Sequence, residues 1–118
     1  MSLDHFDWEV EGVSVLHLQG SITLGEGTQK LRQLVHDTLE AGKRKILLNM
    51  AEVHYLDSSG LGELIAAYTS VKHRGGQLKV MKLTPRVRDV VQLTKVHSII
   101  EVFPDEESAV RSFGSAAG

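Results

Sequence analysis

The chain of 118 residues contains no cysteine, few aromatic residues and no long apolar run. Without cysteine, disulfides, thiol nucleophiles and thiolate metal sites are excluded. The aromatic content is only 5%, so the sequence indicates neither a base-stacking platform nor an aromatic cage for a cation. The sequence also has no run long enough to span a bilayer and no signal-peptide core near its amino terminus. These absences predict a cytoplasmic protein with no membrane partner.

Positive and negative charges are nearly balanced. A formal net charge of −2 gives no reason to expect nucleic acid or an anionic membrane surface as a partner. An apolar content of 42% and a charged content of 24% are typical of a globular protein. At this length we expect one domain over residues 1–118, with a core from about 4 to about 113 and a frayed tail at 114–118.

Strand patterns and helix patterns alternate along the sequence. Strands are expected at 6–10, 13–20, 45–50, 78–81 and 99–103. Helices are expected after a loop at 20–27, from 59 to 72 or 73, from 85 to 93 and after 104. The resulting β-β-α-β-α-β-α-β-α order predicts an α/β fold, with a central sheet of about five strands flanked by about four helices.

Two stretches carry more specific structural predictions. Thr23 and Glu26 match a capping box, in which each side chain satisfies a free N–H at the start of a helix. Residues 46–50 are apolar at nearly every position, so we expect a strand covered on both faces, as in the middle of a parallel sheet. Residues 51–56 are then expected to form a short connector to the next helix.

The segment Asp57-Ser58-Ser59-Gly60-Leu61-Gly62 stands between that strand and a helical pattern. We expect the strand to deliver two adjacent hydroxyls and a carboxylate to the first turn of a helix. Free N–H groups and the positive end of the helix dipole make such a turn suitable for an anion. The two glycines are interpreted as positions of close packing or of a partner's approach.

Enzymatic chemistry at this segment is disfavoured. A serine hydrolase needs a nucleophile, a base and an orienting acid, and the Gly-x-Ser-x-Gly pattern is absent because positions 56 and 57 are leucine and aspartate. The paired glycines lack the rest of a dinucleotide or phosphate-binding motif. No two of the six histidines have the spacing of a helical metal pair. We therefore expect a protein that is not an enzyme, with no catalytic residue, no metal and no cofactor.

The surplus of hydroxyls beside Asp57 points to regulation. One residue suffices to cap a helix, a contribution of about 1 kcal/mol, and here three capping residues stand in a row. Phosphate on Ser58 would add roughly −1.5 to −2 units of charge. The helix start would tolerate this charge and Asp57 would repel it. A partner that buries the segment would therefore lose affinity.

At this motif the chain resembles the STAS domain family, specifically the bacterial anti-sigma factor antagonists. The resemblance rests on residues 46–50, 55–62, 75–80 and 85–93. It implies a single STAS-type domain with a mixed sheet, which acts by partner switching. In such proteins the unphosphorylated form binds an anti-sigma factor that is a serine kinase, and so releases the sigma factor. The resemblance implies that phosphorylation of Ser58 abolishes this binding and that a PPM-type serine phosphatase restores it.

The resemblance also implies a docking surface for the kinase. It comprises Asp57, Ser58, Ser59, Gly60, Leu61 and Gly62, with Ser21 and Thr23 in the loop beside them. Many relatives carry acidic residues at the positions of Ser21 and Thr23, so the choice of partner stays open. Two other functions remain as alternatives. One is a scaffold or transporter-associated STAS module without a phosphorylation cycle, and the other is an enzyme, such as a hydrolase using Ser58.

Overall fold

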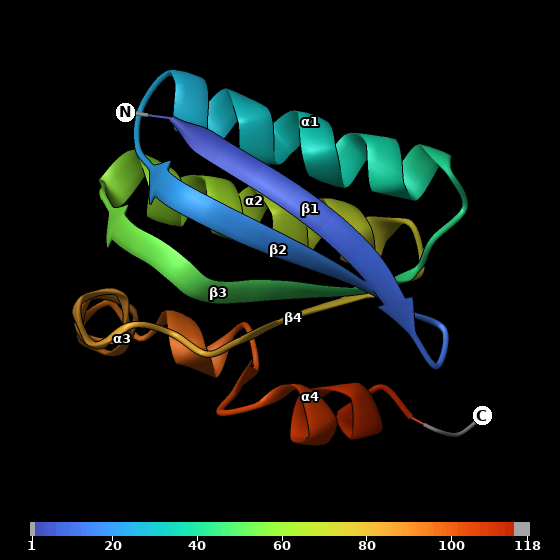
Figure 1. Cartoon of the computed structure of the whole chain (residues 1–118). Coiled ribbons are helices and arrows are strands. Elements are labelled where there is room, and N and C mark those ends of the chain that lie inside the picture. Colours follow the sequence, from blue (N-terminus) through green and yellow to red (C-terminus); the bar gives the residue numbers. More distant parts are fainter. Residues whose placement is uncertain (1, 115–118) are drawn as a thin grey trace.

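The computed structural model describes residues 2–114 and has an α/β fold (Figure 1). Its elements are β1 (Leu3–Val10), β2 (Val13–Ile22), α1 (Glu26–Glu40), β3 (Lys45–Leu56), α2 (Ser58–His73), β4 (Gln77–Met81), α3 (Pro85–Leu93), the short 3-10 helix η1 (Val96–Ser98), β5 (Val102–Phe103) and α4 (Glu106–Ser112). This order confirms the predicted α/β alternation. Apart from residue 114, the predicted frayed tail lies outside the described residues. None of the described helices is long and apolar enough to cross a membrane.

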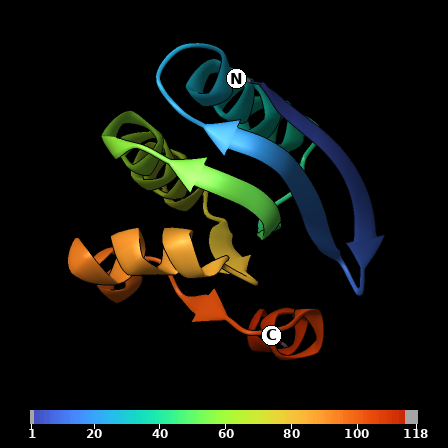
Figure 2. The ribbon, with the colours of Figure 1, turned by 60° about the vertical axis from the view of Figure 1, so that its left-hand side comes forward.

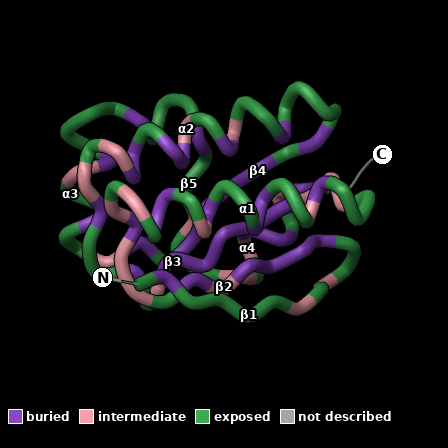
Figure 3. The backbone as a smooth tube through the Cα atoms, turned by 90° about the horizontal axis from the view of Figure 1, so that it is seen from above, coloured by how far each residue is buried: buried purple, intermediate pink, exposed green. Residues whose placement is uncertain are grey.

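The five strands form one mixed sheet in the order β1-β2-β3-β4-β5, which Figure 2 shows from dark blue to orange-red. β1 and β2 are antiparallel and are joined by Glu11 and Gly12, whose φ values of 49° and 80° suit a tight hairpin turn. All later pairs are parallel, with a helix between each strand and the next. β1 is therefore an edge strand and is mostly exposed, whereas β2 and β3 are mostly buried (Figure 3).

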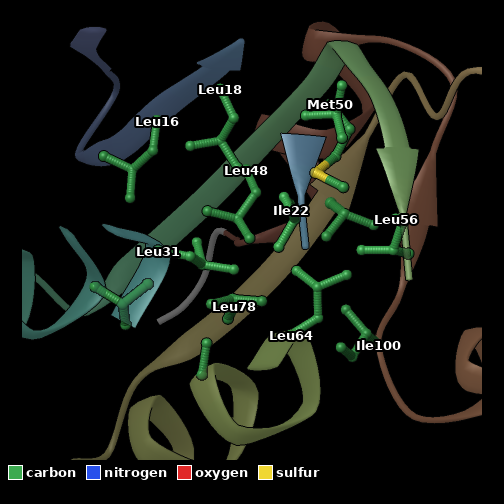
Figure 4. Packing of buried hydrophobic residues seen from close by; sticks show 14 of the residues in the cluster. Leu16, Leu18, Ile22, Leu31, Leu48, Met50, Leu56, Leu64, Leu78 and Ile100 are labelled. Atoms are coloured by element: carbon green, nitrogen blue, oxygen red, sulfur yellow. The ribbon is translucent and has the colours of Figure 1, made fainter. Parts of the chain in front are cut away.

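Side chains from the two faces of the sheet enter two separate apolar clusters. On one face, Leu16 and Leu48 pack beneath α1 and α2, as Figure 4 shows. On the other face, their neighbours Val15 and Leu47 pack in a cluster that includes Phe113, next to α4. Successive side chains of a strand point to opposite faces. β2 and β3 are thus covered on both faces, which confirms the prediction for residues 46–50.

β3 continues to Leu56, so the predicted connector at 51–56 is wrong. Its last residues pair with β2, with Glu52 opposite Gln19 and Tyr55 opposite Ser21. β2 also extends beyond its predicted end at residue 20. Two register shifts interrupt this part of the ladder, and such irregularities break the alternation of apolar and polar residues by which a strand is recognised.

The last strand is shorter than predicted. β5 contains only residues 102–103, and the prediction of a strand at 99–101 is wrong. Lys95 adopts a left-handed conformation with φ of 62° and leads into η1. Ile100 then enters the main apolar cluster, while Ile99 is left exposed. The pattern of a short apolar run does not distinguish a strand from another kind of buried segment.

Candidate functional site

The candidate site, called the corner, comprises residues 57–62, where β3 ends and α2 begins. Asp57 follows β3 directly and is the N-cap residue of α2. Its Oδ1 accepts a hydrogen bond from the N–H of Gly60 at 2.7 Å, and its carbonyl oxygen accepts one from the N–H of Leu61 at 2.9 Å. The predicted helix start is confirmed, and among the three candidate capping residues Asp57 is the one that caps.

Asp57 also holds the loop that precedes α1. Its other carboxylate oxygen, Oδ2, accepts a hydrogen bond from the N–H of Leu24 at 3.0 Å. Its own N–H donates to the carbonyl oxygen of Ile22 at 3.4 Å. The hydrogen bonds from Gly60 and Leu24, the larger effect first, hold the pKa of the Asp57 carboxyl below its usual value of 3.8. The corner therefore carries a fixed negative charge at neutral pH.

The hydroxyls of Ser58 and Ser59 take no part in this capping. Ser58 is exposed and Ser59 is half-buried. The cap is completed by the Asp57 carboxylate, and neither serine hydroxyl forms a hydrogen bond within residues 2–114. Ser58 is the first residue of α2, so its hydroxyl lies at the positive end of the helix dipole. The corner thus presents one exposed hydroxyl that the fold does not use.

The two glycines of the corner have different roles. Gly60 is buried, and a Cβ there would overlap the carbonyl oxygen of Ile22. Gly62 is exposed, and a Cβ there would meet nothing within 4 Å. Between them, Leu61 is 9% exposed and belongs to the main apolar cluster. Gly60 is therefore a position of close packing, whereas Gly62 leaves open space on the outer surface.

Ser21 and Thr23, which are predicted to join the docking surface, lie beside the corner, but Ser21 belongs to β2 and only Thr23 to the loop after it. Ser21 is paired with Tyr55 at the end of the β2–β3 ladder. Thr23 directly precedes Leu24, whose N–H is bound by Asp57. Both Ser21 and Thr23 are half-buried. The fold thus brings the loop and the corner together, although more than thirty residues separate them in the chain.

The predicted capping box between Thr23 and Glu26 is wrong. Gly25 is the N-cap of α1, with φ of 102°, and no side chain caps this helix. Glu26 is consequently the first residue of α1 and not the third, which is the position that a capping box requires. The backbone carbonyl of Thr23 instead accepts a hydrogen bond from the N–H of Thr28 at 3.1 Å.

Leu24 is a feature of the site that the sequence interpretation missed. Its side chain is 77% exposed, although its backbone is held by Asp57. The available signal was an apolar residue next to a glycine in a loop. A single exposed leucine is ordinary on a protein surface. The N–H of this one is bound by Asp57, the residue before Ser58, so an apolar side chain is exposed close to the corner.

Three chemical features meet at the corner. It combines an exposed hydroxyl, an ionised carboxylate and the start of a helix. The histidines that form hydrogen bonds, His17 and His97, bond to Asn49 and to Val91, not to the corner serines. Over the part of the chain that the structure describes, no three histidine, aspartate or glutamate side chains are grouped so that they could hold a metal ion.

Known proteins match this chain along nearly its whole length. The sequence model of the STAS domain matches residues 8–109. A protein of Bordetella bronchiseptica, named as a candidate anti-sigma factor antagonist, is 25% identical over 108 residues, which are 92% of each chain. An anti-sigma F factor antagonist of Paenibacillus polymyxa is 26% identical over 103 residues, which are 84% of this chain and 85% of the relative.

Solved structures share the fold. An anti-sigma factor antagonist from Mycobacterium paratuberculosis has a TM-score of 0.82 and 23% identity, and the match covers 95% of this chain and 94% of that one. The Bacillus anti-sigma factor antagonist SpoIIAA matches with a TM-score of 0.68 and 18% identity in its unphosphorylated form, over 95% of this chain and 100% of that one. Its phosphorylated form gives the same TM-score and identity, over 92% and 98%.

Proposed function

The chain belongs to the STAS domain family, and we propose that it is an anti-sigma factor antagonist switched by phosphorylation of Ser58. One observation carries the proposal. Asp57 caps α2, and this leaves the exposed hydroxyl of Ser58 without a structural role. The names of its relatives, which are anti-sigma factor antagonists, support the same role.

The proposed cycle has two chemical steps on Ser58. The unphosphorylated corner docks on an anti-sigma factor that is also a serine kinase, and the sigma factor is released. The kinase then transfers the γ-phosphoryl group of ATP to Oγ of Ser58, which yields phosphoserine, ADP and a proton. A PPM-type serine phosphatase hydrolyses the phosphoserine with water and releases inorganic phosphate. ATP and magnesium are bound by the kinase, and this chain supplies the acceptor hydroxyl.

Phosphorylation weakens docking through charge and desolvation. Phosphate adds roughly −1.5 to −2 units of charge, next to the ionised carboxylate of Asp57. In the free protein the start of α2 stabilises part of this charge, so the fold persists. A partner that covers the corner must remove water from both anions, at a cost of roughly several kcal/mol per ion. The affinity for the partner therefore falls, and no conformational change of this chain is needed.

The docking surface combines residues that make contact with residues that shape the corner. Ser58, Gly62 and Leu24 are exposed and can touch a partner directly. Gly60 and Leu61 are buried, so they act by holding α2 against the core. Asp57, Ser59, Ser21 and Thr23 are half-buried at the edges of the same surface.

The test is phosphorylation in vitro by each kinase-type anti-sigma factor of the source organism, purified separately. Mass spectrometry of the wild-type protein should find one added phosphate on Ser58. Ser58→Ala should accept none, and the matched control Ser59→Ala should accept phosphate normally. Phosphate on Ser59 or elsewhere, with Ser58→Ala still modified, would show that the site is wrongly assigned.

Binding of the same kinases should be measured by calorimetry. We expect Ser58→Asp to weaken binding while Ser59→Ala leaves it unchanged, because the first change alone adds charge at the exposed position. If the wild-type protein binds none of the kinases and Ser58 accepts no phosphate, a contact module without a phosphorylation cycle becomes the better hypothesis. Ester turnover abolished by Ser58→Ala would favour the hydrolase instead.

A further inference from the structure

An arginine lies over an aromatic ring of β3, two residues before the corner begins. The guanidinium of Arg86 is positioned over the ring of Tyr55, with its carbon 5.6 Å from the ring centroid. Tyr55 lies on β3, two residues before Asp57, and is 41% exposed. Oγ1 of Thr84 donates to the carbonyl oxygen of Val53 at 3.0 Å, which ties the start of α3 to the same end of β3. Figure 1 shows α3 at the end of the molecule that carries the arrowhead of β3.

Arg86 forms no salt bridge with another side chain in residues 2–114. The cations that do form salt bridges there are Arg32, Lys43, Arg74, Lys79 and Arg111. The Arg86 guanidinium is exposed, and its hydrogen-bond donors are not used within residues 2–114. Its planar fork of donors matches the two oxygens of a carboxylate. Arg86 is therefore an exposed cation, near an aromatic ring, that is available to a group outside this part of the chain.

The charges at the start of α3 run against its helix dipole. α1 and α4 have acidic residues in their first turns, the arrangement that a helix dipole favours, whereas α2 has none. The first turn of α3 has no acidic residue, and its sequence begins Pro85-Arg86-Val87-Arg88. Arg88 is exposed and donates to the carbonyl oxygen of Leu83 at 3.4 Å. The helix dipole does not favour Arg86 at this position, whereas an oppositely charged surface outside the chain would.

We propose that Arg86 forms a basic lip on the docking corner, and that this lip binds a carboxylate of the protein that docks on Ser58. The inference rests on the proposed function, because it assigns the charge of the partner at one edge of the same interface. Tyr55 acts as the platform that keeps the Arg86 fork in place. Residues 21–24, at the β2 side of the corner, are uncharged, so the lip supplies a positive charge at the opposite side of the ionised Asp57.

The test uses the kinase that phosphorylates Ser58 in the assay above, in nucleotide-free form. Arg86→Glu should weaken binding by about tenfold or more, mainly through slower association, and should make the binding less sensitive to salt. Arg86→Lys keeps the charge but not the planar set of donors, and it should raise the dissociation constant about threefold. The control Lys72→Glu makes the same charge change on an exposed residue of α2, roughly 20 Å along the helix from Ser58. It should change the dissociation constant by less than about twofold.

The outcomes separate this inference from the proposed function. If Ser58→Asp weakens binding and Arg86→Glu does not, the basic lip is refuted and the phosphorylation switch stands. If the wild-type protein binds no kinase, both proposals fail. Should Arg86→Glu unfold the protein, as judged by circular dichroism, Arg86→Gln supplies the same test with a smaller change. Restored binding between Arg86→Glu and a kinase with lysine in place of one carboxylate would identify the partner residue directly.

Discussion

Oδ2 of Asp57 accepts a hydrogen bond from the backbone N–H of Leu24 at 3.0 Å, although the two residues are 33 positions apart. The other oxygen of the same carboxylate binds the N–H of Gly60 at 2.7 Å. One side chain thereby joins the loop before α1 to the first turn of α2. The shape of the surface around Ser58 therefore depends on an ionised Asp57.

Removal of the Asp57 carboxylate should free the loop at Leu24. In Asp57→Ala we expect the amide hydrogens of Leu24 and Gly60 to exchange faster by roughly tenfold or more, because both lose their acceptor. Amide exchange followed by NMR measures this. Asp105→Ala is the matched control, since Asp105 caps α4 through the N–H of Ser108. It should accelerate amide exchange at Ser108 and leave the exchange rate at Leu24 unchanged. Equal exchange rates at Leu24 in the wild type and in Asp57→Ala would contradict the prediction.

The contribution of Asp57 to stability should disappear in acid. The N–H groups of Gly60 and Leu24 lower the pKa of its carboxyl from 3.8, so its stabilising effect is fully present above the unfolded-state pKa and is lost as the pH falls through the lower folded-state pKa. Asp57→Asn should thus be less stable than the wild type at neutral pH, and the difference should shrink below about pH 4. Urea unfolding at a series of pH values measures it. A pH-independent difference would be inconsistent with this assignment.

Substitution of the two glycines of the corner by alanine should change the free energy of unfolding in opposite directions. Gly60→Ala places a Cβ on the carbonyl oxygen of Ile22, so we expect a loss of about 2–4 kcal/mol in the free energy of unfolding. Gly62→Ala enters open space on a helix and should add about 0.5–1 kcal/mol by reducing the freedom of the unfolded chain. Denaturant unfolding of the pair checks both signs. Similar effects from the two substitutions would count against the packing described for α2.

Ser58→Asp should leave the protein folded. The Ser58 hydroxyl is exposed and makes no hydrogen bond within the described residues, so the free energy of unfolding should change by less than about 0.5 kcal/mol. Leu61→Asp is the contrasting control, because Leu61 is buried in the main apolar cluster and the variant should be strongly destabilised. Thermal unfolding distinguishes them. A large loss of stability in Ser58→Asp would mean that weaker kinase binding by that variant reports unfolding and not charge.

A buried lysine should prove important for the attachment of α4. Nζ of Lys79 is 3.0 Å from the carbonyl oxygen of Ser112, 2.9 Å from its Oγ and 3.0 Å from Oε1 of Glu101. Lys79→Met leaves these oxygens without their donor and should lower the free energy of unfolding by about 2 kcal/mol. Arg111→Ala, which breaks an exposed pair with Glu107, should cost less than about 0.5 kcal/mol. Chemical denaturation of both variants decides whether Lys79 has this role.

Features with local causes could be predicted from the sequence. α3 occupies residues 85–93 as expected, because proline at its first position suits the start of a helix. The start of α2 followed from capping residues next to a helical pattern. The burial of residues 46–50 on both faces followed from an apolar run that has too few polar residues for a strand with one solvent-exposed face. In each case the signal that supported the prediction lies within a few neighbouring residues of the sequence.

Features that depend on distant pairing could not be predicted. The extension of β3 to Leu56 requires β2 alongside it, and the start of α1 was displaced by the left-handed Gly25. The composition and motif of the chain by themselves determined that a strand delivers an acid and two hydroxyls to a helix start. Only the tertiary structure decided that the acid also binds the N–H of Leu24, that Ser58 takes no part in the cap, and that Arg86 lies over the ring of Tyr55. The physical reason is that the contacts of Asp57 with Leu24 and of Arg86 with Tyr55 join residues about thirty positions apart, where no local spacing rule connects them.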